Sequence, residues 1–170
     1  MWLTKDGHFV SAYHVLKAYV NTEQMWDYKH GKDFPVRAII KDANENQYYV
    51  DNYLVIDVEK DIIIGKARID KPLTLPALSF AGPSETVKDT PLMIWHENKL
   101  SEGKIEYVDE NWMITNIEGP HGMSGSAIWA HGRLAGIVTH HNNEDHAQGP
   151  PVVNIYNLLS DYVRRHKERH

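Results

Sequence analysis

Ser124 stands between two glycines in the segment Gly122-Met123-Ser124-Gly125-Ser126-Ala127, and an apolar run follows at once. A serine in a tight turn between apolar strands is presented to solvent as a nucleophile. The backbone N–H groups of such a turn can point at a negatively charged oxygen. The pattern therefore predicts a nucleophilic serine at position 124.

A serine is a weak nucleophile near neutral pH, so it needs a general base, and the base needs a group that fixes its tautomer. His14 is the candidate base because it stands where a strand-like run passes into a short helical segment. Asp61 is the candidate acid because it lies directly before the apolar run 62–64. Asp57 also precedes that run and is the alternative acid.

The composition limits the classes of partner. The chain has 170 residues, of which 42% are hydrophobic, enough to bury a core as one domain or two subdomains. With 18 basic and 23 acidic side chains, the formal charge of −5 offers no general attraction for nucleic acid or anionic membranes. A protein or peptide partner is the expectation.

Cysteine is absent, which excludes disulfides, thiolate metal sites and a cysteine nucleophile. The sequence contains no export signal and no apolar run of about 18 residues, the length that a membrane span needs. These features predict an intracellular protein that does not span a membrane.

Short strand-like runs separated by polar turns dominate the chain and predict an all-β fold of the sandwich or paired-barrel type. The expected strands are 8–11, 36–41, 48–58, 62–66, 92–96, 104–108, 112–117, 127–130, 134–139 and 152–155. Helices are expected at 13–20 and at 154–166, the latter amphipathic. The proline-containing segment 70–84 predicts a boundary between two halves, 1–70 and 71–170.

Several histidines raise the question of a metal site: His121, His131, His140, His141 and His146. Adjacent strand residues point to opposite faces, so His140 and His141 cannot both bind one ion there. No cysteine or closely spaced carboxylate motif completes a ligand set. The sequence predicts neither a metal nor another cofactor.

Three motifs in order resemble the chymotrypsin-like serine proteases, of the cysteine-free bacterial or viral type. The segment 10–16, VSAYHVL, is similar to the family's V-(S/T)-A-A-H-V-(V/L), and 61–64, DIII, resembles its D-(I/L)-A-(L/V). The segment 122–127 is similar to G-x-S-G-(G/S)-(P/A). Residues 132–139, GRLAGIVT, resemble the next strand of trypsin-like enzymes, and 150–156 resemble a strand leading into the C-terminal helix.

The resemblance covers nearly the whole chain and implies two six-stranded antiparallel β-barrels with a C-terminal helix. Ser124 would attack the scissile carbonyl, His14 would act as base and then acid, and Asp61 would hold the imidazole. The turn of Gly122, Met123 and Ser124 would form the oxyanion hole, with the Gly122 and Ser124 N–H groups as donors.

Three departures from the family pattern change what is expected. Only 13 residues precede His14, which predicts a truncated first barrel. Met123 replaces the aspartate that receives a freed N-terminal ammonium in zymogen-activated members, so that switch is not expected. Pro151 falls at a position where trypsin-like enzymes have a pocket-lining glycine, which would reshape the pocket.

Substrate contacts are expected from two further places. Glu118 precedes Ser124 by six residues, the spacing of the acid at the pocket floor in trypsin-like enzymes. It would favour cleavage after basic residues, and a solvent-exposed glutamate is the alternative reading. The edge formed by Thr139, His140 and His141 would pair with an extended substrate.

The sequence thus predicts a serine endopeptidase acting through a Ser-His-Asp triad. It leaves two alternatives open. One is a catalytically silent peptide-binding or scaffolding module of the same fold, and the other is a maturation protease excised from a larger protein.

Overall fold

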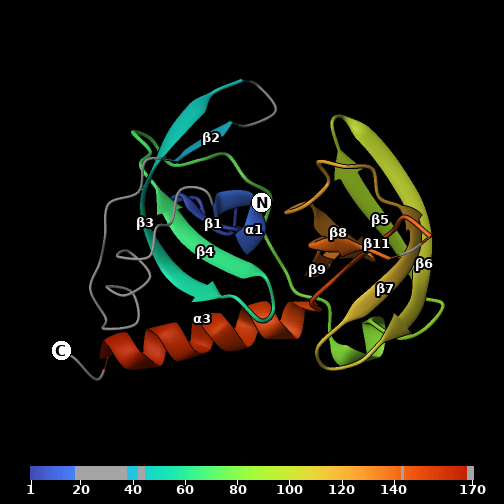
Figure 1. Ribbon diagram of the computed structural model, residues 1–170. Coiled ribbons are helices and arrows are strands. Elements are labelled where there is room, and N and C mark those ends of the chain that lie inside the picture. Colours follow the sequence, from blue (N-terminus) through green and yellow to red (C-terminus); the bar gives the residue numbers. More distant parts are fainter. Residues whose placement is uncertain (18–37, 42–44, 143, 168–170) are drawn as a thin grey trace. The chain divides into compact units, whose positions relative to one another are not determined.

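The computed structural model describes residues 1–17, 38–41, 45–142 and 144–167 (Figure 1). The chain divides into two compact units, Met1–Pro76 and Ala77–His170, and their boundary lies within the proline-containing segment 70–84. The first unit contains β1 (His8–Ala12), α1 (Tyr13–Leu16), β2 (Ile39–Lys41), β3 (Gln47–Asp57) and β4 (Ile62–Ala67). The second contains η2 (Pro83–Glu85), β5 (Pro91–His96), β6 (Lys99–Val108), β7 (Met113–Glu118), β8 (Ala127–Ala130), β9 (Arg133–Ile137), β10 (His140–His141), β11 (His146–Gly149) and α3 (Val152–Lys167).

The described part of the first unit forms one curled antiparallel sheet of four strands in the order β1-β4-β3-β2 (Figure 1). Strand β4 is central and begins with three isoleucines that are fully buried. The register places Ala12 of β1 opposite Ile62 of β4. The start of α1 and the turn before β4 are therefore neighbours.

The first unit has its own hydrophobic core. It includes Phe9, Leu16, Val50, Tyr53 and Ile63, with Trp2 packed edge-on against Tyr48 at its margin. Because Leu16 is the buried residue of α1, it holds this short helix against the sheet.

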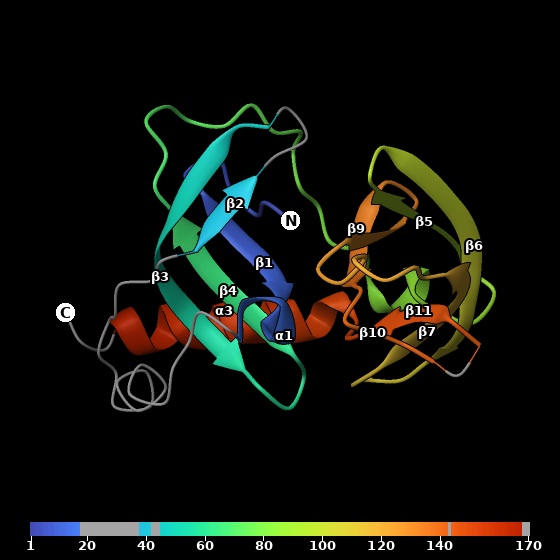
Figure 2. The same ribbon diagram turned by 45° about the horizontal axis from the view of Figure 1, so that its top comes forward.

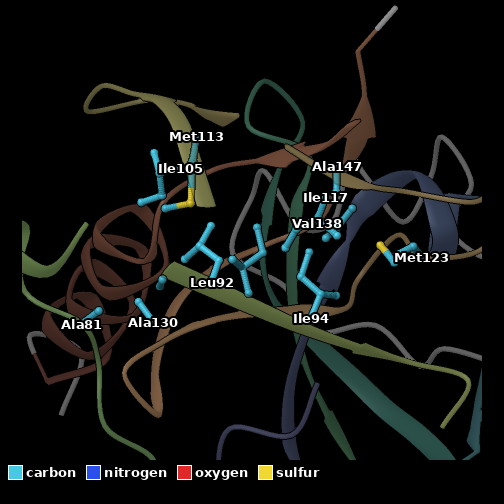
Figure 3. Packing of buried hydrophobic residues seen from close by; sticks show 12 residues of the cluster. Ala81, Leu92, Ile94, Ile105, Met113, Ile117, Met123, Ala130, Val138 and Ala147 are labelled. Atoms are coloured by element: carbon cyan, nitrogen blue, oxygen red, sulfur yellow. The ribbon is translucent and has the colours of Figure 1, made fainter. Parts of the chain in front are cut away.

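The second unit forms a curled antiparallel sheet of seven strands in its described residues, in the order β10-β11-β7-β6-β5-β8-β9. Strand β10 lies beside β11 at one edge (Figure 2). One buried cluster fills the concave side (Figure 3), and it consists of Ala81, Leu92, Ile94, Ile105, Met113, Ile117, Met123, Ile128, Ala130, Ala135, Val138 and Ala147. The expected all-β fold with a C-terminal helix is confirmed.

One predicted strand is wrong, and two strands were not predicted. Residues 152–155 form the first turn of α3, because burial of Val152, Asn154 and Ile155 in the helix outweighs the strand preference of β-branched residues. Strands β10 and β11 lie between the expected strands 134–139 and 152–155, where no strand was predicted. The predicted positions 18–20 and 36–37 lie outside the described residues.

Among the described residues, no helix is both long enough and apolar enough to cross a lipid bilayer.

Strand β11 comes very close to the end of β9, and mutation of a glycine at this contact tests how tight the packing is. A Cβ atom at Gly149 would overlap the backbone carbonyl oxygen of Ile137, whereas Gly132, with φ +75° in the β8–β9 turn, has no atom within 4 Å of such a Cβ. Replacing Gly149 by Ala should lower the free energy of unfolding by about 3 kcal/mol or more, because backbone must move.

Gly132→Ala is the matched control and should cost only about 1 kcal/mol, the usual penalty of a left-handed conformation. Urea unfolding of both variants measures the difference. Equal costs would show that the contact at Gly149 relaxes easily.

Candidate active site

Two backbone segments of the first unit bring His14 and Asp61 together. His14 lies in α1, directly after β1, and Asp61 ends the β3–β4 turn. The pairing of Ala12 with Ile62 aligns the two segments, and the Tyr13 N–H donates to the Asp61 carbonyl oxygen at 2.9 Å. The contact between the two side chains thus follows from the β1–β4 register.

The Asp61 carboxylate accepts two hydrogen bonds from one residue. Oδ1 accepts from the His14 backbone N–H at 2.8 Å, and Oδ2 lies 2.6 Å from His14 Nδ1. The Asp61 side chain is 10% exposed and the His14 side chain 46% exposed. Because an ionised carboxylate only accepts, the network assigns the proton of the neutral ring to Nδ1 and leaves Nε2 as the acceptor nitrogen.

The backbone of Asp61 has φ +54°, a left-handed conformation that aspartate and asparagine tolerate better than most residues. Asp57, the alternative acid, instead accepts a hydrogen bond from the Lys60 N–H at 3.0 Å within the same turn. Of the two candidates, it is Asp61 that hydrogen-bonds to His14.

Ser124 belongs to the second unit, in the turn between β7 and β8. The Met123 N–H donates to the Pro120 carbonyl at 3.2 Å, and the Ser126 N–H donates to the Met123 carbonyl at 3.0 Å. Two tight turns therefore follow each other, and glycines with positive φ stand on both sides of the serine, Gly122 at 96° and Gly125 at 87°. Ser124 is half-buried between them.

Backbone hydrogen bonds and one buried side chain hold this turn against the rest of the second unit. The Gly125 N–H donates to the Val138 carbonyl at 2.7 Å, and the Val138 N–H donates to the Ser126 carbonyl at 2.9 Å. The Met123 side chain is 1% exposed and belongs to the buried cluster of Figure 3. An apolar anchor directly before Ser124 restricts how far the serine backbone can move.

The N–H groups of this turn differ in their availability. That of Met123 donates to the Pro120 carbonyl, in keeping with an oxyanion hole whose expected donors are the Gly122 and Ser124 N–H groups. Within the part of the chain that the structure describes, the N–H groups of Gly122 and Ser124 donate to no protein acceptor. These two groups can bind a negatively charged oxygen.

The predicted substrate edge lies at the margin of the sheet, because β10 is the terminal strand in the sheet order. The Thr139 N–H donates to Gln148 at 2.9 Å, and the Thr139 hydroxyl lies 2.9 Å from His140 Nδ1. The His140 ring packs on Trp112 with a centroid distance of 5.4 Å. An edge strand of this kind can accept one further extended chain.

The imidazole of His141 covers the backbone of Gly119, where any Cβ would overlap the ring, and its edge packs against His121 with a centroid distance of 6.3 Å. Glu118 lies next to Gly119 at the end of β7 and is exposed, like Asn116 on the same face of the strand. The exposed position of this carboxylate is the one that the alternative reading of Glu118 expects.

Pro151 was expected in a strand but is buried directly before α3, where it forms an isolated bridge with Gly136. The strand that precedes the helix is β11, and its glycine is Gly149. From the sequence, this strand was expected too close to the C-terminus, because residues 152–155 have the composition of a strand.

One histidine outside the predicted set contacts the turn of Ser124. His96 ends β5, and its Nδ1 lies 3.5 Å from the Ser126 hydroxyl. Every second residue of β5 faces the core, and His96 continues the series Leu92, Ile94. This alternation in the sequence could have predicted that His96 faces inward. Among the described residues, no group of three or more His, Asp or Glu side chains is arranged to hold a metal ion.

The chain matches no protein-family model and no curated protein.

The double hydrogen bond of Asp61 generates a prediction about the His14 ring. Asp61→Asn keeps a residue that tolerates positive φ but removes the negative acceptor of the Nδ1 proton. The Nδ1–H tautomer should fall from the dominant to the minor neutral form. Imidazole ¹⁵N chemical shifts measure the ratio directly.

Asp57→Asn is the matched control, since Asp57 accepts from Lys60 in the same turn. It should leave the His14 shifts unchanged. Identical ring shifts in the wild type and Asp61→Asn would contradict the tautomer assignment.

Proposed function

We propose that this chain is a serine endopeptidase of the chymotrypsin-like type, with Ser124 as nucleophile, His14 as general base and acid, and Asp61 as the group that orients His14. The observation that carries the proposal is the double hydrogen bond from His14 to the Asp61 carboxylate. It fixes the ring position through the backbone and the tautomer through Nδ1, which is what a base for a serine requires.

The proposed reaction has two steps. The Ser124 Oγ attacks the scissile carbonyl while its proton passes to His14 Nε2, and the same proton then goes to the leaving amine as the C–N bond breaks. Water next attacks the acyl-enzyme carbonyl and gives a proton to His14 Nε2. The bond between that carbon and Ser124 Oγ then breaks, His14 returns the proton to Oγ, and the acid product leaves. The proposal requires His14 Nε2 of the first unit and Ser124 Oγ of the second to come within hydrogen-bond distance.

The N–H groups of Gly122 and Ser124 are the proposed donors to the oxyanion of each tetrahedral intermediate. Their lack of protein acceptors in the described residues supports this role. Losing one such donor costs about 3–4 kcal/mol of transition-state stabilisation in enzymes of this kind.

The burial of Met123 supports an enzyme that needs no cleavage to assemble its nucleophile turn. Zymogen-activated relatives hold this turn through an ion pair with a new N-terminal ammonium. Here the residue before the nucleophile is apolar and lies in the core. We therefore propose a constitutively formed turn.

The proposed substrate is an extended segment of protein or peptide that pairs with the outer side of β10, the terminal strand of the described sheet. A processing role on one particular protein is a narrower version of the same proposal. A silent peptide-binding module would use the same edge, and labelling of Ser124 separates it from an enzyme.

The triad itself is tested by reaction with a fluorophosphonate. The wild type should be labelled at Ser124, and Ser124→Ala should lose both the label and peptide hydrolysis, the latter by about 10⁴-fold or more. His14→Ala should slow the labelling strongly, because it removes the base from the other unit. Mass spectrometry of the labelled peptide locates the site.

Ser101→Ala, in β6, is the control and should retain the label. A wild-type protein without label, folded by circular dichroism, would instead support the silent module.

Any preference for basic residues before the scissile bond is tested at Glu118. Because this carboxylate is exposed, its attraction for a substrate cation is worth about 1 kcal/mol at most. Glu118→Gln should lower kcat/KM for lysine and arginine substrates by about fivefold or less. A loss of a hundredfold would place Glu118 in a desolvated pocket after all, and cleavage of a positional peptide library measures it.

A further inference from the structure

His96 lies on the core-facing side of β5, in line with the buried residues Leu92 and Ile94. Its side chain is only 17% exposed. A largely buried imidazole in such a row is unfavourable unless its ring nitrogens find polar partners. The neighbours of the ring nitrogens therefore show which segment His96 packs against.

The first partner follows from the sheet register. Strand β5 pairs antiparallel with β8 through Met93 opposite Trp129 and Ile94 opposite Ile128. Continuing the same register by two residues sets His96 opposite Ser126. The two side chains meet there as same-face neighbours, with 3.5 Å between His96 Nδ1 and Ser126 Oγ.

The adjoining Cε1–Nε2 edge of the ring faces the other end of the same turn. A Cβ atom at Gly122 would lie 3.9 Å from both Cε1 and Nε2 of His96, which is ordinary van der Waals distance. Nε2 also lies 3.8 Å from the Glu97 carboxylate. The ring thus contacts Ser126 and lies close to Gly122, and these residues are the two ends of the segment that has Ser124 at its centre.

The backbone that carries His96 is itself fixed. Glu97 and Asn98, with φ values of 47° and 61°, form the two-residue turn between β5 and β6, and His96 pairs with Lys99 across it. Two successive left-handed residues match the twist of the hairpin strands. The ring thus projects from a rigid hairpin end, whereas the segment it contacts is a turn.

We propose that His96 is a positioning residue that clamps the turn 122–126 and so holds the Gly122 and Ser124 N–H groups in place. Its catalytic consequence rests on the proposed function, because these N–H groups are the proposed oxyanion donors. Since they act on the transition state, loss of the clamp affects kcat more than KM.

Three variants at this position separate packing from polar contact. His96→Ala removes the ring, His96→Asn retains an amide near the place of Nδ1, and His96→Gln retains one near the place of Nε2. His131→Asn is the matched control, because His131 is an exposed histidine of the same unit and asparagine accepts its positive φ of 51°.

The readout that does not depend on activity is the amide ¹H–¹⁵N spectrum. His96→Ala should shift the Gly122, Ser124 and Gly125 signals, and His96→Asn should shift them less because it keeps the contact with Ser126. Ser126→Ala should give a smaller change of the same kind and keeps the proposal testable if His96→Ala does not fold. His131→Asn should leave these signals in place.

The kinetic readout is peptide hydrolysis. His96→Ala should lower kcat by about tenfold to a hundredfold with KM within about twofold, since small displacements of oxyanion donors carry costs of this size. His96→Asn should recover most of the loss. Unchanged amide signals and unchanged kcat in His96→Ala would overturn the clamp, and so would a loss that appears in KM alone.

The outcomes also separate the two proposals. If fluorophosphonate does not label the wild type but the amide signals respond to His96→Ala, the proposed function fails and the clamp stands. If the wild type is labelled but neither the amide signals nor kcat responds to His96→Ala, the clamp fails and the proposed function stands.

Discussion

The hydrogen bonds between His14 and the Asp61 carboxylate are the interaction on which the proposed chemistry depends. A carboxylate that accepts from both the backbone and the ring of one residue fixes position and tautomer together. The contact needs the β1–β4 register, because a slip of one residue would turn the alternate side chains to the other face and misalign Asp61 with α1. The three buried isoleucines of β4 hold that register.

The turn of Ser124 is held by a different means. Its backbone bends through two successive tight turns, and the positive φ values of Gly122 and Gly125 make this bend possible. Flexibility of glycine alone would not hold the serine in one place. The buried Met123 side chain and the hydrogen bonds with Val138 restrain the turn. The glycines thus allow the bend, and these contacts keep the serine in position.

Much of this arrangement was predictable, since strand alternation and turn residues act locally. The runs that became β1, β3, β4, β5, β7 and β8 were expected nearly as they occur, and so were His14, Asp61 and Ser124 as candidates. Prediction failed where tertiary burial outweighs local preference. The β-branched residues at 152–155 lie in a helix. Strands β10 and β11 were missed for another reason: they pair through backbone hydrogen bonds in a polar part of the chain that lacks a strand-like composition.

Residue order by itself determined which side chains can do chemistry and that the fold is mostly β, because both follow from residue type and short-range pattern. Only the tertiary structure decided that Asp61 and not Asp57 contacts His14, that Met123 cannot offer its N–H, that Glu118 is exposed, and that His96 lies beside the Ser124 turn. These facts depend on strand register and hydrogen-bond partners between segments far apart in the chain, and a linear pattern does not contain them. Gly122-Met123-Ser124 marks the candidate nucleophile, but its surroundings come from the sheet.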